Sequence, residues 1–153
     1  MLEPMTSDPS DESSGVQLII ESESSLEHIR FLEEKLYEFN VQATGISDGN
    51  PLGPSMRATD GSLIGGVSGW TWGGTCYIRY LFVRANMRNQ RHGTTLMHAV
   101  EKEAKFRGCQ QIVVETHDFQ APGFYQKLGF QVISHVADYP RGHQYLTLVK
   151  RLA

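Results

Sequence analysis

The stretch from Tyr77 to Phe106 limits what this chain can fold into, because a strand pattern, a basic turn and a helix pattern follow one another directly. Bulky, β-preferring side chains crowd into Tyr77–Val83 with little alternation, which predicts a strand covered on both faces. Beyond the turn, apolar residues recur at steps of three and four, which predicts an amphipathic helix. These helix residues are Leu96, Met97, Val100 and Ala104. The succession predicts a fold that mixes strands with helices.

The turn between strand and helix, residues 88–94, is basic and carries a glycine at the helix entrance. The start of a helix leaves about four backbone N–H groups without internal partners and has partial positive charge. A basic turn that leads into a helix is therefore suited to a ligand that bears phosphate groups.

Two motifs resemble those of the GNAT family of N-acetyltransferases. Arg88-x-x-Arg91-x-Gly93 is similar to the acetyl-coenzyme A loop of that family, (Gln/Arg)-x-x-Gly-x-(Gly/Ala). The segment Ala121–Phe130 resembles the second motif, a helix that carries Ala-x-x-x-Tyr-x-x-x-Gly-Phe. The motifs occur in the order of the family, with a helix and a strand between them, and the match covers roughly half of the chain.

The resemblance implies an α/β (α+β) fold of the GNAT type, with a mixed, mostly antiparallel sheet flanked by helices. At its centre, two parallel strands would splay apart, here Tyr77–Val83 and Ile112–Thr116. A helix connects these strands, so they must run parallel with a right-handed crossover. The implied activity is transfer of an acetyl group from acetyl-coenzyme A to a primary amine, by direct attack in a ternary complex. No metal is implied.

The resemblance also assigns the cosubstrate site. Backbone groups of Leu81, Phe82 and Val83 would hold the pantetheine arm, and the peptide N–H of Phe82 would stabilise the oxyanion. The turn would hold the pyrophosphate through backbone N–H groups, with two arginines as nearby cations. These turn residues are Arg88, Asn89, Gln90, Arg91, His92, Gly93 and Thr94.

Two positions depart from the family pattern. Arg91 stands where the family has the first glycine of the loop, so its side chain either crowds the pyrophosphate or adds a cation to it. Asp118 stands where the family often has asparagine. A pantetheine contact there would keep an acceptor but lose the amide donor.

Tyr125 matches the family tyrosine that acts as general acid at the coenzyme sulfur. A phenol with a pKa of about 10 is protonated at neutral pH and can donate to a forming thiolate, whereas its neighbour Phe124 is expected to pack in the core. For removal of the amine proton, Glu115 ends the second parallel strand and is the assigned catalytic candidate. His117 follows it, and ordered water needs no residue at all, so these routes stay open. Arg79 is a further candidate for contact with the substrate, as is Tyr80.

Charge and composition limit the kinds of ligand that the protein is expected to bind. The net charge of the 153-residue chain is −3, and the first 15 residues hold four acidic and no basic side chains. The remaining near-neutral body with a basic turn suits a small anionic ligand better than a nucleic acid. No apolar run approaches the length of a membrane span and no signal-peptide pattern begins the chain, so a cytoplasmic location is expected. Cys76 and Cys109 have no metal-binding spacing and are expected to be apolar fillers.

Residues 1–15 are polar, acidic and proline-containing, which predicts a disordered tail before a single N-acetyltransferase domain at 16–153. Residues 45–54 are rich in turn formers and predict a loop. The remaining predicted elements are listed in chain order: strand Val16–Glu21; a helix opened by a Ser24–Glu27 capping box and running to Phe39; a hairpin of Met56–Thr59 and Leu63–Thr71; helix Ala121–Leu128; and strands Phe130–Val136 and Gln144–Lys150.

Several functional alternatives remain. A small-molecule acceptor, such as an antibiotic or a polyamine-like metabolite, is favoured over a protein or peptide. Residues 138–143 also resemble, over a short stretch, a bacterial GNAT branch that includes nucleoside-antibiotic acetyltransferases. A non-catalytic coenzyme A sensor is the alternative of another class. It is supported by Arg91 and Asp118 but opposed by Tyr125. Tyr145–Val149 is apolar enough for a covered strand edge, which leaves a homodimer open.

Overall fold

The computed structural model describes residues 15–153, so the expected tail lies outside the described residues except for Gly15. The chain divides into two compact units, Met1–Phe39 and Asn40–Ala153, which are described separately.

The described part of the first unit contains most of helix α1, Leu26–Thr44. The helix begins after Ser25, whose Oγ accepts a hydrogen bond from the backbone N–H of His28 at 3.1 Å. The predicted Ser24–Glu27 capping box is therefore wrong by one residue. Val16–Glu21 was expected to be a strand and is not one, because within the described residues it pairs with no other strand.

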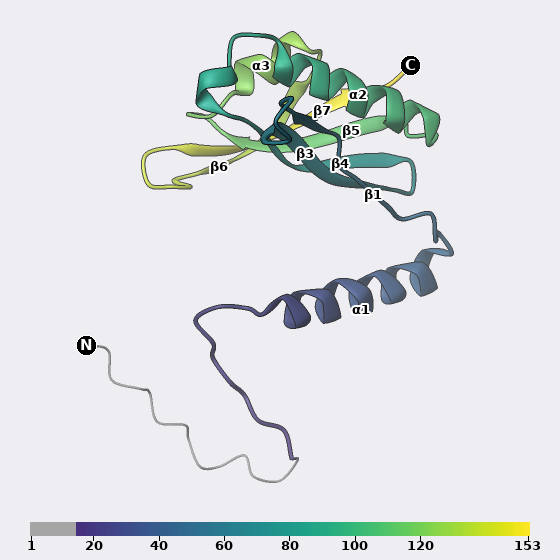
Figure 1. Cartoon of the computed structure of the whole chain (residues 1–153). Helices are drawn as coiled ribbons and strands as arrows, with labels where there is room; N and C mark the ends of the chain where they lie inside the picture. The colour runs from purple at the N-terminus through teal and green to yellow at the C-terminus, as the bar shows by residue number, and fades with distance from the viewer. Residues whose placement is uncertain (1–14) are drawn as a thin grey trace, which may run out of the picture. The chain divides into compact units, whose positions relative to one another are not determined.

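The second unit contains a seven-stranded sheet (Figure 1). Its strands are β1 (Asn50–Leu52), β2 (Ser55–Arg57), β3 (Leu63–Trp72), β4 (Thr75–Val83), β5 (Gln111–His117), β6 (Gln131–Ala137) and β7 (Gln144–Arg151). The spatial order is β1-β3-β4-β5-β7-β6, with β2 also paired to β3. Every pair is antiparallel except β4 with β5. The predicted mixed sheet with one central parallel pair is confirmed.

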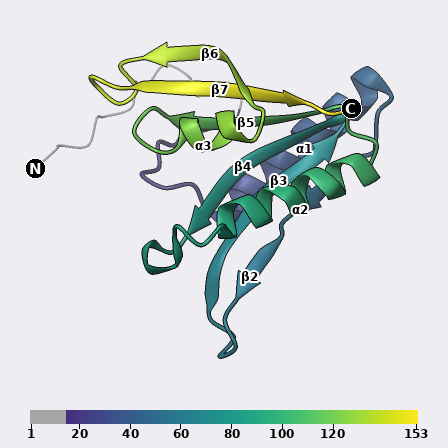
Figure 2. The same ribbon diagram turned by 90° about the horizontal axis from the view of Figure 1, so that it is seen from above.

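Helices α2 (His92–Phe106) and α3 (Pro122–Lys127) cover one face of this sheet (Figures 1 and 2), and a short 3-10 turn, Ala85–Met87, precedes α2. The core lies between that face and α2. Its largest fully buried members are Cys76, Ile78, Val100, Ile112, Val114 and Leu148. Each buried aliphatic side chain of this size contributes about 1.5–3 kcal/mol. Both cysteines are buried and unpaired, in accord with their predicted packing role.

The coverage of β4 differs from the expectation at its second half. Within the second unit, this segment is covered on one face: Leu81 and Val83 pack against the core, whereas Tyr80 and Phe82 are 62% and 61% exposed. The cause is a bulge at Arg79: Ile78 pairs with Gly69 and Tyr80 with Ser68, which leaves Arg79 as an extra residue. The bulge shifts the alternation of side chains along the strand.

The two parallel strands pair over only half of their length. Thr75–Ile78 pairs with Gln111–Val114, and beyond this point β4 and β5 share no register. Because β5 stays paired with β7 up to His117, its free edge faces the second half of β4 across a gap. The expected splay between the central strands is confirmed.

The C-terminal strand does not provide the free edge that its apolar pattern suggested. β7 lies between β5 and β6 and pairs with both, so Tyr145–Val149 is covered within the same chain. The expectation of an edge there is wrong, and the outermost strand on this side is β6.

Candidate active site

A groove of about 1100 Å³ runs along the gap between β4 and β5. Its walls come from four separate segments: the second half of β4, the turn before α2, the end of β5 and the start of α3. The fold thus brings both sequence motifs to one cavity. All the expected site residues line it except Gln90, His117 and Asp118.

The turn before α2 has an unusual backbone. Arg91, the N-cap residue of α2, has φ 64° and ψ 16°, and Asn89 has φ 61°. Both are left-handed conformations, which glycine adopts at no steric cost and other residues at a cost of about 1–2 kcal/mol. The conformation of Arg91 explains why the GNAT motif has glycine at this position.

The same turn has features that suit an anion. Left-handed residues in a turn direct successive peptide N–H groups to one side, where they form an anion-binding concavity. The N-terminus of α2 adds its free N–H groups. The guanidinium of Arg88, in the same turn, donates through Nε to the carbonyl oxygen of Val83 at 3.0 Å and lies 5.4 Å from the Phe82 ring. Nε2 of His92 is buried and has no hydrogen-bond partner among the described residues, although His92 lines the groove. An unsatisfied buried nitrogen of this kind is suited to an oxygen-rich ligand.

Tyr125 occupies the helical wall of the groove. It projects from α3, is 6% exposed and packs against the rings of Phe124 and Phe130 at 5.2 and 5.6 Å. Burial raises the pKa of Tyr125 to about 12, because the charged phenolate would lose its hydration. The phenol is therefore a protonated hydrogen-bond donor throughout the neutral range.

Glu115 lies where β4 and β5 separate, on the other face of the sheet from the core. Its Oε2 accepts hydrogen bonds from Tyr77 Oη at 2.6 Å and from Tyr145 Oη at 3.0 Å. Burial, followed by the bonds to Glu115, raises the pKa of Tyr77 and raises that of Tyr145 to about 12. Glu115 lines the groove, and its carboxylate is held in place by neutral phenols from two neighbouring strands.

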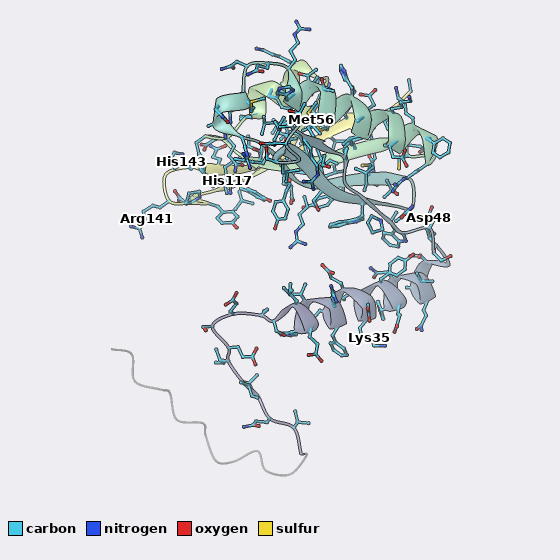
Figure 3. The ribbon with its side chains drawn as sticks, viewed as in Figure 1. Lys35, Asp48, Met56, His117, Arg141 and His143 are labelled. Atoms are coloured by element: carbon cyan, nitrogen blue, oxygen red, sulfur yellow. The ribbon has the colours of Figure 1, made fainter. Side chains whose placement is uncertain are left out.

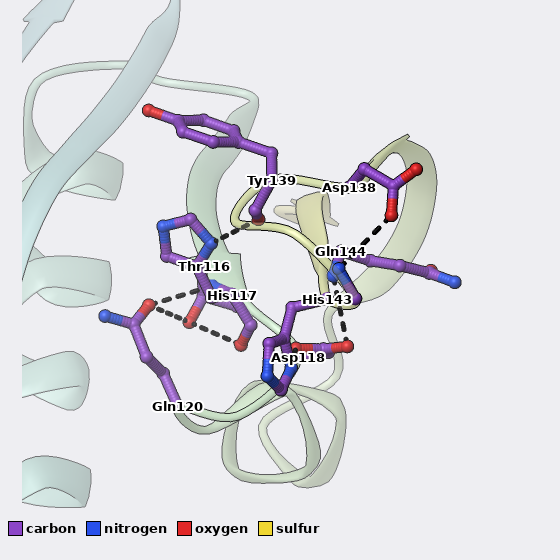
Figure 4. A network of polar contacts seen from close by, with 9 residues as sticks. Thr116, His117, Asp118, Gln120, Asp138, Tyr139, His143 and Gln144 are labelled. Atoms are coloured by element: carbon purple, nitrogen blue, oxygen red, sulfur yellow. Dashed lines mark hydrogen bonds and ion pairs between the residues drawn. The ribbon is translucent and has the colours of Figure 1, made fainter.

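Residues of the segment that ends β5 and follows it contact the loop between β6 and β7 (Figures 3 and 4). Nδ1 of His117 lies 3.0 Å from the carbonyl oxygen of Tyr139, and because a carbonyl only accepts, this nitrogen is the donor. The His117 ring also stacks on Phe119 at 5.1 Å. His117 is not among the residues that line the groove.

Asp118 also links the segment after β5 to the start of β7. Its Oδ2 accepts a hydrogen bond from the backbone N–H of Gln144 at 3.1 Å, and Oδ1 lies 3.1 Å from Nδ1 of His143 (Figure 4). The carboxylate fixes the start of β7. A role for Asp118 in holding the pantetheine arm finds no support in this geometry.

The backbone of β4 also corrects one expected role. The backbone N–H of Arg84 donates to the carbonyl oxygen of Ile64, and a Cβ on Gly65 would lie 2.6 Å from the carbonyl oxygen of Phe82. In an antiparallel ladder, alternate residues direct both peptide groups to the same neighbour. The N–H of Phe82 therefore faces β3, and the peptide groups that face the gap are those of Leu81 and Val83.

Several groove residues were missed by sequence reasoning. Met87, Thr116, Phe119, Gln120 and Ala121 line the cavity. The two phenols that hold Glu115 were missed as well, because their meeting depends on the pairing of β5 with β7. Gln120 organises the turn after β5, where its Oε1 accepts from the hydroxyl of Thr116 at 2.9 Å and from the N–H of His117 at 2.8 Å.

Within residues 15–153, no group of His, Cys, Asp and Glu side chains is arranged to hold a metal ion. None of the described helices combines the length and apolar character needed to cross a membrane.

Comparison with known proteins agrees with this geometry. The profile of the acetyltransferase (GNAT) family matches residues 17–130. An acetyltransferase of Agrobacterium fabrum is 29% identical over 136 residues, which cover 89% of this chain and 99% of that protein. Blasticidin-S acetyltransferase of Streptomyces morookaense is 40% identical over 96 residues, or 60% of this chain and 68% of the relative.

A solved structure agrees with these sequence matches. The crystal structure of an acetyltransferase from Agrobacterium tumefaciens is 28% identical and superimposes with a TM-score of 0.80. The match covers 90% of this chain and 100% of that one. The chain therefore belongs to the GNAT family of acetyltransferases.

Proposed function

We propose that this enzyme transfers the acetyl group of acetyl-coenzyme A to a primary amine of a small molecule, by direct attack in a ternary complex. The observation that carries the proposal is the groove between the splayed strands, which is lined by Tyr125 of α3 and Glu115 of β5. A proton donor and a carboxylate thus lie along one cavity.

The groove fits the cosubstrate, which supplies the reactive thioester. The peptide groups of Leu81 and the N–H of Val83 face the gap and are available to the pantetheine arm, as an added strand would use them. The carbonyl oxygen of Val83, in contrast, accepts a hydrogen bond from Nε of Arg88 at 3.0 Å. The turn 88–94, with its two left-handed residues and the N-terminus of α2, holds the pyrophosphate. The Arg88 and Arg91 guanidinium groups add positive charge there, and Nε2 of His92 gains the partner that it lacks.

The chemistry requires a proton for the departing thiolate and stabilisation of the oxyanion. Tyr125 donates the proton, because its raised pKa keeps the phenol protonated at neutral pH. A peptide N–H that faces the gap, from Leu81 or Val83, polarises the thioester carbonyl in place of that of Phe82. Glu115 serves the acceptor side of the groove.

The preference for a small acceptor rests on the relatives. One of them, at 40% identity over 96 residues, is named for acetylation of blasticidin S, a small molecule. The similarity of residues 138–143 to antibiotic acetyltransferases supports the same class.

Calorimetric titration with acetyl-coenzyme A tests the cosubstrate site. Micromolar binding is expected, weakened about tenfold or more in Arg88→Ala/Arg91→Ala, because charge-assisted contacts to phosphate are lost. Arg57→Ala/Arg151→Ala removes the same charge from β2 and β7 and serves as the control. Absence of binding by the folded wild type would overturn the proposal. Where binding is found, release of coenzyme A thiol in the presence of primary amines tests the transfer itself.

A further inference from the structure

We infer that Glu115 anchors a cationic group of the acceptor other than the amine that becomes acetylated, so the acceptor is a small molecule with two or more cationic nitrogens. This inference rests on the proposed function, since it assigns the acceptor site of the same groove. It adds Tyr77 and Tyr145 as the residues that position the anchor.

The carboxylate of Glu115 is held in one orientation. Glu115 is the first residue of β5 beyond the last pair with β4, Ile78 with Val114, so it lies at the mouth of the gap. Tyr77 comes from β4 and Tyr145 from β7, and both hydroxyls donate to the same atom, Oε2. A carboxylate oxygen accepts about two hydrogen bonds, so Oε2 is satisfied within the protein. Oε1 is left for a donor from the groove.

Glu115 is not ion-paired with any cation among the described residues. Within residues 15–153 it receives hydrogen bonds from the two phenols and forms no ion pair. The guanidinium of Arg79, two residues after Tyr77 on β4, lies over the ring of Tyr80 at 5.2 Å, and its charge opposes the rise in the pKa of Tyr77 without an ion pair to Glu115. The raised pKa values keep Tyr77 and Tyr145 neutral at physiological pH, so the cluster carries one negative charge.

Such a site favours an organic cation. A partly buried carboxylate has lost hydration, and a ligand cation restores a strong, charge-assisted hydrogen bond at Oε1. The rings of Tyr77 and Tyr145, whose hydroxyls bond to the carboxylate, lie beside it, and aromatic rings attract ammonium and guanidinium groups. A neutral or anionic acceptor would gain neither contact.

The amine that attacks is not the group bound at Glu115. An amine must lose its proton to act as a nucleophile, and a charge-assisted bond to a fixed carboxylate stabilises the protonated form. A second cationic nitrogen bound at Oε1 leaves the reactive amine free to lose its proton to water. Of the routes that the sequence left open for this proton, the geometry thus favours water over Glu115.

A pair of amines of equal length tests the anchor. 1,4-Diaminobutane and n-pentylamine differ in that one terminal ammonium is replaced by methyl. For the wild type, kcat/KM is expected to be about tenfold higher for the diamine, and this preference should decline as sodium chloride screens the charge. Glu115→Gln keeps the size and the acceptor oxygens but removes the charge. It should reduce the preference about tenfold while leaving acetyl-coenzyme A binding unchanged.

Glu103→Gln, which removes a carboxylate paired with Arg107 on α2, should leave the preference intact. Equal use of the two amines by the wild type, or a preference that survives in Glu115→Gln, would overturn the inference while leaving the proposed transfer standing. If neither amine is acetylated, calorimetric titration of 1,4-diaminobutane into the complex of the enzyme with coenzyme A tests whether Glu115 binds the cation. Binding that is lost in Glu115→Gln supports the anchor and contradicts the proposed transfer, whereas no binding refutes the anchor. Should Glu115→Gln fail to fold, the salt dependence of the wild-type preference gives the same decision.

Discussion

A Cβ placed on Gly93, at the start of α2, would lie 3.3 Å from Cζ of Phe124 in α3. The glycine of the first motif thus lies against Phe124, the residue that precedes the tyrosine of the second motif. This packing holds the anion-binding turn at a fixed distance from Tyr125, the neighbour of Phe124. The two motifs therefore form one packed unit.

Replacement of Gly93 by alanine should destabilise the protein by about 1 kcal/mol, because the added methyl group overpacks against Phe124. Gly123→Ala is the matched control. Its Cβ would meet no atom within 4 Å, and alanine is the better helix former, so it should be neutral or stabilising by up to about 1 kcal/mol. Urea unfolding measures both variants. Equal stability of the two would show that Phe124 yields without cost.

Arg91→Gly should raise stability and lower cosubstrate affinity at once. Glycine adopts φ 64° without strain, which favours the folded state by about 1 kcal/mol, whereas loss of the guanidinium removes a cation from the turn. Arg91→Ala separates the two effects, since it loses the cation but keeps the strained backbone. Thermal unfolding and calorimetric titration with acetyl-coenzyme A provide the readouts. Tighter binding by Arg91→Gly would show that the side chain crowds the ligand instead of attracting it.

The local patterns predicted the centre of the fold. The run of bulky residues, the basic turn and the three-and-four spacing gave β4, the turn and α2 within one or two residues. The crossover rule then required β5 to be parallel to β4, and this was confirmed. These features were predictable because each depends on neighbours in sequence.

Features that depend on distant partners were not predictable. Residues 45–54 were expected to be a loop, yet Asn50–Leu52 pairs with β3 as strand β1. The side chain of Arg107, more than 50 residues later, donates to the carbonyl oxygens of Asn50 and Pro51 and holds that short strand. Val16–Glu21 shows the converse, since a sequence suited to a strand forms none where no partner strand pairs with it.

The residues of the candidate site also divide into those that local motifs predict and those that depend on distant partners. The turn and Tyr125 belong to motifs of consecutive residues and could be assigned from the sequence. The environment of Glu115 could not, because it depends on β4 and β7 bringing Tyr77 and Tyr145 to one carboxylate oxygen. Asp118 matched the motif position of an amide, and only the structure shows that its carboxylate is engaged with Gln144 and His143.

Tyr125→Phe should bind acetyl-coenzyme A normally but transfer the acetyl group about 100-fold more slowly, because the general acid is lost while the ring remains. The measurement is kcat from thiol release, together with a calorimetric affinity. Tyr139→Phe removes a phenol from the β6–β7 loop and should change kcat little. A Tyr125→Phe enzyme with unchanged kcat would assign Tyr125 a packing role alone.

The buried phenols should also make the protein sensitive to alkaline pH. Burial raises the pKa of Tyr125 from 10.0 to about 12, so between these values the folded state keeps a proton that the unfolded chain releases. The free energy of unfolding is therefore unaffected by this group below pH 10 and falls as the pH rises further. For Tyr125 alone, the loss amounts to about 1.4 kcal/mol at pH 11. Tyr145, with its pKa also raised to about 12, acts in the same direction.

Urea unfolding of the wild type and Tyr125→Phe between pH 8 and 11 checks this dependence. The variant has no phenol to ionise at this position, so its stability should decline less steeply than that of the wild type. Tyr80→Phe, which removes an exposed phenol, should follow the wild-type curve. Parallel curves for the wild type and Tyr125→Phe would mean that the phenol of Tyr125 ionises as readily in the folded protein as in the unfolded chain. In that case burial would not raise the pKa of Tyr125, although the phenol would still be protonated at neutral pH.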